Sequence, residues 1–215
     1  MSPVLLSLKV AGTATALTVL SGIPLAWLLG RRRFRGKTLV ETAVLLPLVL
    51  PPTVLGYYLL VVLSRQGVIG SLFDRFGMEL AFTWRGAVIA AWVGSFAMFT
   101  RSAQAGFELV DTRLEDAART LGRSERSIFW HVTLPLAWRG VVAGTMLAFC
   151  RAVGEFGITL MVAGNIPGRT QTIPLAIYDH VQANRLDAAD QLSILTLILV
   201  AGLLLIVGRL TRARS

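Results

Sequence analysis

Five long apolar stretches set the strongest limit on how this chain of 215 residues can fold. Most approach or exceed the roughly 20 residues that an α-helix needs to cross the hydrocarbon core of a bilayer. They are residues 4–29, 39–63, 87–107, 140–162 and 192–207. With 54% hydrophobic and only 15% charged residues, the chain has too few polar side chains to cover a soluble surface of its size. The sequence therefore predicts an all-α integral membrane protein with about five transmembrane helices in a single domain, residues 1–215.

The first run, residues 4–29, has the position of a secretory signal peptide, and a retained helix is the alternative. It lacks the basic segment with which a signal peptide begins. No small-residue cleavage site precedes the basic cluster RRRFRGK at residues 31–37. A retained first transmembrane helix fits these residues better.

Basic residues predict the orientation of the helices, because Lys and Arg concentrate on the cytoplasmic side of membrane proteins. If all five runs cross the bilayer, thirteen basic residues share the side of the C-terminus and five lie on the other side. The thirteen are Arg31, Arg32, Arg33, Arg35, Lys37, Arg113, Arg119, Arg123, Arg126, Arg139, Arg209, Arg212 and Arg214, and the five are Arg65, Arg75, Arg85, Arg169 and Arg185. We expect the N-terminus outside, the C-terminus inside and a cytoplasmic loop at residues 108–138. Orientation also accounts for the net charge of +9, which therefore does not argue for a nucleic-acid partner.

The sequence of this cytoplasmic loop predicts two short helices. Thr112 and Glu115 have the spacing of a capping box, in which side chains satisfy free backbone N–H groups of the first turn. Gly122 suits the left-handed conformation that ends a helix, Ser124 suits the start of a second helix, and Pro135 is expected to end that one. The first helix carries a narrow apolar stripe formed by Leu114, Ala117, Ala118 and Leu121. The stripe predicts either a docking element for a cytoplasmic partner or a loop that lies on the membrane surface.

The segments EDAARTLG, residues 115–122, and VTLP, residues 132–135, resemble the EAA loop in the membrane subunits of binding-protein-dependent ABC importers. That pattern consists of Glu-Ala-Ala and Gly, followed at a fixed distance by Ile and Leu-Pro. The matching residues here are Asp116, Ala117, Ala118, Gly122, Val132, Leu134 and Pro135. Asp116 and Val132 depart from the pattern conservatively, and Glu115 is an alternative source of the acidic contact. The resemblance implies a coupling helix, with Leu121 among its residues, that inserts into a groove of an ATP-binding subunit.

Two further segments resemble the molybdate permeases among these importers: GNIPGRTQTIPLAIYDHVQ at residues 164–182 and PLVLPPTVLGYYLL at residues 47–60. Sulfate permeases resemble the chain in the same regions. The resemblance implies a permease subunit in the bacterial cytoplasmic (inner) membrane that carries a tetrahedral oxyanion, with molybdate or tungstate favoured over sulfate or thiosulfate. It also implies a homodimer, two cytoplasmic ABC ATPase subunits that bind ATP and magnesium, and an extracytoplasmic oxyanion-binding protein.

A glycine-rich stretch in residues 164–182 looks like a phosphate-binding loop but departs from that motif. Gly164 and Gly168 are one residue too close together, and Arg169 stands where the motif has lysine. We therefore expect no ATPase site, catalytic residue, cofactor or metal site on this chain, which would be a transporter subunit rather than an enzyme. The competing class is a secondary transporter driven by an ion gradient. It would predict internal repeats, and the sequence contains no detectable repeat.

Arg151 and Glu155 lie four residues apart within the fourth apolar run, which would place them as a pair on one face of a single helix. A charge at the centre of a bilayer costs roughly 2.5–3.5 kcal/mol on insertion scales, so both side chains should face protein or a watery path. The pair is either a structural clamp, which we slightly favour, or a positive element on the route of the anion. In the second run, Pro47, Pro51 and Pro52 should break the helix, as part of a conduit wall or as an architectural kink.

Overall fold

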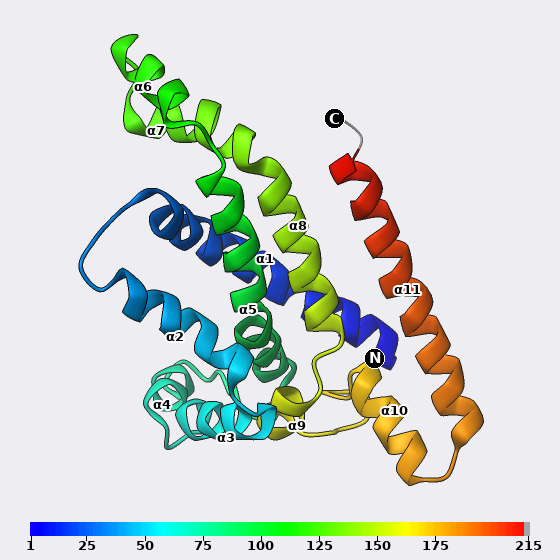
Figure 1. Cartoon of the computed structure of the whole chain (residues 1–215). Helices are drawn as coiled ribbons and strands as arrows, with labels where there is room; N and C mark the ends of the chain where they lie inside the picture. Colours follow the sequence, from blue (N-terminus) through cyan, green and yellow to red (C-terminus); the bar gives the residue numbers. More distant parts are fainter. Residues whose placement is uncertain (213–215) are drawn as a thin grey trace.

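The computed structural model describes residues 1–212, and every regular element in that range is helical (Figure 1). The elements are α1 (Pro3–Arg31), α2 (Lys37–Val49), α3 (Pro52–Leu63), α4 (Val68–Asp74), α5 (Trp84–Glu108), α6 (Thr112–Thr120), α7 (Glu125–Ile128), the π-helical turn η1 (Phe129–Thr133), α8 (Leu134–Val153), α9 (Gly157–Ala163), α10 (Ile173–Gln182) and α11 (Leu186–Arg212). The all-α fold class predicted from the sequence is confirmed.

Helices α1, α5 and α8 pack against one another and form the core of the molecule. Of the 25 residues of α5, 14 are buried, and most of these are Gly, Ala, Ser or Thr. Small side chains allow neighbouring helices to approach closely. A Cβ atom added to Gly140 of α8 would lie only 2.6 Å from the Cα of Gly106 in α5. The core therefore depends on close contact between helix backbones as well as on interlocking side chains.

Among the described residues, three helices are long and apolar enough to cross a membrane: α1, the continuous helix from Glu125 to Val153, and α11 as far as Leu205. The bent pair of α2 and α3 makes a fourth if it is counted as one span. Helix α5 has the necessary length, but its many small residues keep its hydropathy lower than that of α1 or α11. All five predicted runs coincide with helical segments, while the number of spans stays a prediction.

The second predicted span, residues 39–63, consists of two helices, and the chain bends by 110° between them. A residue that precedes proline is driven towards extended backbone, and Leu50, which precedes Pro51, has φ −64° and ψ 141°. Pro52 takes the first position of α3, where its missing N–H leaves no hydrogen bond unmade. Pro51 and Pro52 therefore break this run, as predicted, into the arm α2 and the short helix α3, which packs on α9. Pro47 lies inside α2 and does not end it, which corrects the prediction for that residue.

The fourth predicted span, residues 140–162, is also discontinuous. Helix α8 ends at Val153, and the chain turns through Gly154 before α9 begins at Gly157. Helix α9 packs against α3 and α5. Two of the five predicted spans are thus broken helices, and the two breaks belong to segments that contact each other through α3 and α9.

Pro135 does not end the helix that begins at Glu125, which corrects the prediction from the sequence. It lies in the first turn of α8, directly after the π-helical turn η1. In that turn the N–H of Leu134 donates to the carbonyl of Phe129, five residues earlier. The wider turn relieves the crowding that a proline ring causes inside a regular α-helix. The chain therefore passes from the loop into α8 without a break.

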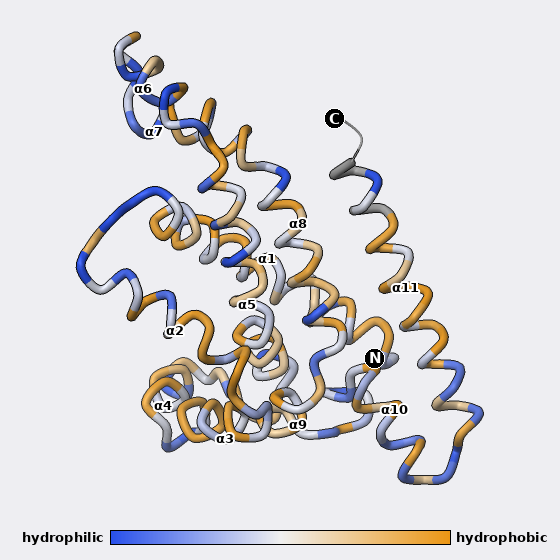
Figure 2. The backbone as a smooth tube through the Cα atoms, viewed as in Figure 1, coloured by the Kyte–Doolittle hydropathy of each residue, from blue (hydrophilic) through white to orange (hydrophobic). Residues whose placement is uncertain are grey.

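The two ends of the molecule carry different sets of predicted loops (Figure 1). Helices α6 and α7 lie at one end together with the end of α1, where Arg31 contacts Glu115. At the other end, the amine of Met1 donates to the carbonyl of Gly168 at 3.2 Å. Figure 2 shows hydrophilic residues mainly in these terminal loops and apolar residues along the helices between them. The predicted orientation requires this arrangement, with the basic cluster at residues 31–37 on the side of α6.

Candidate coupling site and buried ion pair

The helix α6 is capped by Asp111, whose Oδ1 accepts a hydrogen bond from the N–H of Arg113 at 2.9 Å. Thr112 is the first residue inside the helix. The carboxylate of Glu115 is buried and does not reach back to the helix start. The predicted capping box of Thr112 and Glu115 is therefore wrong. Glu115 binds buried partners instead, and Asp111 caps the helix.

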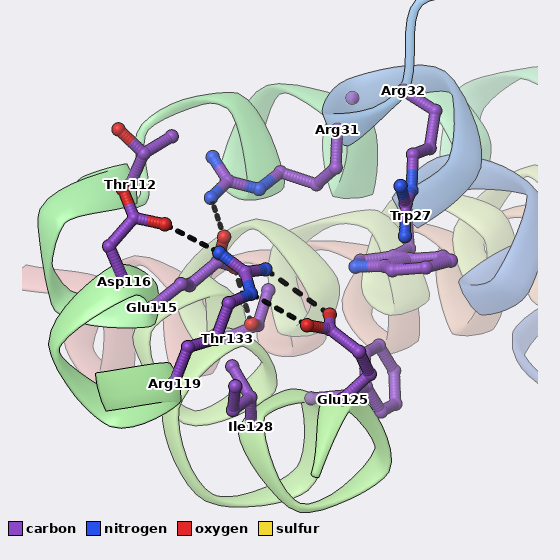
Figure 3. Close-up of a pocket in the computed structure, with 12 residues that line it drawn as sticks. Trp27, Arg31, Arg32, Thr112, Glu115, Asp116, Arg119, Glu125, Ile128 and Thr133 are labelled. Carbon is purple, nitrogen blue, oxygen red and sulfur yellow. Dashed lines mark hydrogen bonds and ion pairs between the residues drawn. The ribbon is translucent and has the colours of Figure 1, made fainter. Parts of the chain in front are cut away.

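Glu115 joins three separate segments of the chain (Figure 3). Its Oε2 forms an ion pair with Nη2 of Arg31, the last residue of α1, and each of the two side chains is only 9% exposed. Its Oε1 accepts a hydrogen bond of 2.6 Å from the hydroxyl of Thr133 in η1. The guanidinium of Arg31 also donates from Nη1 to the carbonyl of Val110 at 2.9 Å. We call Arg31, Glu115 and Thr133 the loop joint.

The opposite face of α6 is exposed. Asp116 and Ala117 lie at the surface, and Leu121 is 82% exposed. Leu114 is also exposed, whereas Ala118 is buried against the protein. Three of the four residues of the predicted apolar stripe therefore face outwards. None of residues 1–212, which the structure describes, covers these three side chains, so the stripe has the placement of a docking surface.

Arg119 connects α6 to α7 across the turn between them. Its Nη1 lies 2.6 Å from Oδ1 of Asp116, and its Nε donates to Oε1 of Glu125 at 2.6 Å. The hydrogen bonds with Glu125 and Asp116 raise the pKa of Arg119 further above its usual range. All three side chains are largely exposed, so this network contributes little to stability and mainly shapes the loop surface.

The turn between the two loop helices follows the prediction. Gly122 has φ +76°, the left-handed conformation that ends α6. The hydroxyl of Ser124 accepts a hydrogen bond from the N–H of Ser127 at 3.4 Å and thereby caps α7. Both residues act locally, which is why the sequence alone was sufficient to assign them.

A cavity of about 390 Å³ lies between the end of α1 and the loop (Figure 3). Three basic and three acidic side chains contribute to its lining, namely Arg31, Arg32, Arg119, Glu115, Asp116 and Glu125. Their formal charges balance, so the cavity has no excess charge with which to hold an anion. Side chains of both the loop joint and the exposed network of Arg119 line it.

The last residues of the EAA pattern lie outside α6. Val132 belongs to η1, and Leu134 and Pro135 begin α8. Leu134 packs against the core cluster that contains Phe107 of α5. The structure therefore divides the predicted coupling residues into two groups: those on α6 and the turn that follows it, and those in a stem that leads into the bundle.

Arg151 and Glu155 are paired, with Nη1 and Oε2 2.7 Å apart. The helix ends before Glu155, so the predicted arrangement on one face of a single helix is not what joins them. Instead, Glu155 lies in the turn between α8 and α9, and its Oε1 accepts a hydrogen bond from the N–H of Ile158 at 2.9 Å. The Glu155 side chain is 2% exposed, against 29% for Arg151. Gly94 of α5 makes room for the carboxylate, because a Cβ there would lie 2.8 Å from Oε2.

Sequence reasoning missed two polar connections between helices. It treated Arg31 only as an orientation signal and did not single out Thr133. It also missed Gln104 of α5, a buried residue whose Nε2 donates to Glu41 of α2 at 3.1 Å. These partners are 18 to 84 residues apart, and no local pattern signals such a pairing.

A helical bundle with broken spans and an exposed helix at one polar end has the architecture of a membrane permease. The family described as binding-protein-dependent transport system inner membrane component matches residues 22–213. The chain belongs to this family, and it is therefore a multi-pass protein of the inner membrane, in agreement with the resemblance stated from the EAA pattern.

Several curated relatives match most of the chain. The molybdenum transport system permease protein ModB of Escherichia coli K12 is 47% identical over 217 residues, which cover 99% of this chain and 95% of the relative. The putative molybdenum transport system permease protein YvgM of Bacillus subtilis is 43% identical, with 82% and 78% covered. A probable sulfate transport system permease protein, cysT of Chlorokybus atmophyticus, is 37% identical, with 96% and 72% covered.

Solved structures of ABC transporters share the fold. One is a bacterial importer of the acidic polysaccharide alginate, with a TM-score of 0.74 at 17% identity, covering 100% of this chain and 81% of the other. Another is the MetNI methionine transporter in an inward-facing conformation, with a TM-score of 0.74 at 18% identity, covering 98% and 93%. At these identities the likeness establishes the fold alone.

Proposed function

We propose that the chain forms the translocation path of an ATP-driven importer for molybdate or tungstate. The observation that carries the proposal is the 47% identity to the Escherichia coli molybdenum permease over nearly the whole of both chains. Relatives with this name elsewhere are 41–46% identical, against 37% for the sulfate permease. Sulfate or thiosulfate is therefore the second candidate. All these substrates are tetrahedral divalent oxyanions, so the binding protein would perform most of the selection.

The importer would consist of two copies of this chain, two ABC ATPase subunits at the end that carries α6, and an oxyanion-binding protein at the opposite end. ATP and magnesium would bind to the ATPase, since this chain would have no ATPase site. Two observations support the arrangement. The docking stripe of α6 is uncovered, and one structure with this fold is a transporter in complex with a periplasmic protein.

The coupling residues divide by position in this proposal. Those at the exposed surface would contact the ATPase directly: Asp116, Ala117, Leu121 and Gly122. Those in the stem or facing it would hold the loop in place: Ala118, Val132, Leu134 and Pro135. Glu115 would not supply the acidic contact, because its carboxylate is buried against Arg31. Asp116 is left as the acidic residue available to a partner.

For Arg151 and Glu155 we propose the structural clamp. Glu155 is nearly inaccessible, and its carboxylate joins the end of α8 to the start of α9 through Arg151 and the N–H of Ile158. A carboxylate in that position stabilises the break in the helix and carries a charge of the wrong sign to attract an anion. The side chain of Arg151 is 29% exposed, so a role of Arg151 on the path can be tested separately.

Reconstitution tests the proposal. The chain is purified with its candidate ATPase and inserted into liposomes, and uptake of labelled molybdate, tungstate and sulfate is measured with the candidate binding protein outside. We expect uptake that requires both ATP and the binding protein, with molybdate or tungstate preferred. Uptake that persists without ATP and follows an imposed ion gradient would instead identify a secondary transporter. ATP-dependent uptake that prefers sulfate would support the importer assignment but show that its substrate is sulfate.

A further inference from the structure

The loop joint is the side-chain link between the exposed helix α6 and the first helix of the bundle. The backbone of α6 packs near α7 and η1 rather than against α1. The side chain of Arg31 spans the remaining distance and meets the carboxylate of Glu115. Through Thr133, the same carboxylate also holds η1, which continues directly into α8. One buried side chain of α6 is therefore tied to the ends of two core helices.

The charged groups of the joint are hydrogen-bonded to each other and largely buried, since each of the two side chains is only 9% exposed. Both oxygens of Glu115 have a partner, and Arg31 uses a second nitrogen on the carbonyl of Val110. A buried charge whose partner is removed is strongly unfavourable, whereas an intact, hydrogen-bonded pair holds one geometry. The joint therefore resists both separation and rotation of α6 relative to α1.

An exposed network in the same loop offers a direct contrast. Arg119 and Glu125 join α6 to α7 by hydrogen bonds of similar length, but their side chains are 42% and 58% exposed. Water can replace each partner there, so the network can break and re-form at little cost. Of these two networks, only the loop joint connects α6 to α1.

We propose that Glu115 is a positioning residue that fixes α6 to α1 and α8 as one rigid unit, so that a displacement of α6 is transmitted to both core helices. The inference rests on the proposed function, in which an ATPase moves α6. It assigns Glu115 to force transmission inside this chain, and it predicts that the joint stays closed throughout the transport cycle.

The first test compares Glu115→Gln with Glu125→Gln, the same substitution in the same loop at an exposed ion pair. The readout is the number of oxyanions transported per ATP hydrolysed by the reconstituted complex, with copurification of the ATPase as the measure of assembly. We expect Glu115→Gln to assemble and to lower this ratio roughly 2- to 30-fold, the range seen for residues that couple distant sites. Glu125→Gln should change it less than about twofold. An unchanged ratio in assembled Glu115→Gln would overturn the inference.

The second test replaces the joint by a covalent link. Arg31→Cys and Glu115→Cys are combined with Cys150→Ala, which removes the only native cysteine, and the pair is treated with a short bifunctional methanethiosulfonate. We expect the uncross-linked protein to be uncoupled and the cross-linked protein to recover most of the lost ratio, reversibly on reduction. If the cross-link blocks uptake or restores none of the ratio, the joint does not act as a rigid link. If Glu115→Gln does not assemble with the ATPase, the cross-linking test by itself decides whether the joint is a rigid link.

The wild-type complex separates failure of this inference from failure of the proposed function. If the wild-type complex shows no ATP-dependent uptake, the importer assignment is wrong and the inference falls with it. If the wild-type complex transports and the Glu115 variants keep its coupling ratio, only the positioning role is wrong.

Discussion

The close crossing of α5 and α8 gives a stability prediction whose size follows from the structure. We consider Gly140→Ala. The new Cβ would lie 2.6 Å from the Cα of Gly106, 2.8 Å from the carbonyl oxygen of Ser102 and 3.0 Å from the N of Gly106. All three are backbone atoms, which cannot rotate away as a side chain can. Carbon atoms prefer separations of about 3.5–4.0 Å, so the two helices would have to move apart by about 1 Å.

Overpacking of this kind typically costs about 1–3 kcal/mol. Separation of the helices would also weaken the hydrogen bond of 3.0 Å from the hydroxyl of Ser102 to the carbonyl of Gly140, a loss of about 1 kcal/mol. Alanine favours the helical conformation over glycine by about 1 kcal/mol, which offsets part of the loss. We therefore expect Gly140→Ala to lower the free energy of unfolding by about 1–3 kcal/mol.

The chain supplies a matched control in Gly12, which lies in α1. Apart from the adjoining backbone of α1 itself, no atom of the described residues lies within 4 Å of a Cβ added there. Gly12→Ala makes the same chemical change without the clash, and we expect it to raise the free energy of unfolding by about 0.5–1 kcal/mol. Both variants can be unfolded by SDS in mixed micelles and followed by circular dichroism. If Gly140→Ala proved as stable as Gly12→Ala, close backbone contact between α5 and α8 would not determine the stability of the bundle.

Three further predictions concern the loop and the ion pair. Ala117→Trp should prevent copurification of the ATPase while leaving the unfolding of the permease unchanged, because the side chain is exposed; normal recruitment and coupling would contradict the docking assignment. Asp111→Ala should destabilise α6 by about 1 kcal/mol through loss of its cap, seen as faster hydrogen exchange at Arg113, and unchanged exchange would contradict this cap. Arg151→Gln should reduce uptake without loss of the ATPase and should lower stability by about 3 kcal/mol. The double variant Arg151→Gln with Glu155→Gln distinguishes the two roles. If it recovers both stability and uptake, the pair is a structural clamp. If it recovers stability but not uptake, Arg151 lies on the path of the anion.

The long apolar runs predicted the helical segments but not how two of them are interrupted. Pro51 and Pro52 indicated the bend between α2 and α3, because proline restricts the backbone of the residue before it, whereas Pro47 is accommodated inside α2. The break after Val153 had no comparable signal. Its stabilising contacts come from Gly94 and Glu155, which meet only after α5 and α8 have packed.

The caps of the loop show the same limit on a smaller scale. Gly122 and Ser124 act through their own backbone neighbours, and both predictions are confirmed. The spacing of Thr112 and Glu115 also satisfied a local rule, yet Arg31, 84 residues away from Glu115 in the sequence, captures the glutamate. A local rule therefore fails where a distant charge competes for the same side chain and the resulting contact is buried.

The placement of Glu115 and of the two leucines at the ends of the stripe of α6 departs from that in an ordinary surface helix. Such a helix buries its apolar stripe and exposes its charges. Here the glutamate is buried, while Leu121 is 82% and Leu114 49% exposed. A single chain gains nothing from this arrangement, because the leucines stay in water and a charge has been desolvated. The arrangement becomes favourable when a partner covers the leucines and moves a helix whose other face is held by the loop joint. For this reason we propose that the docking surface and the loop joint act together on opposite faces of α6.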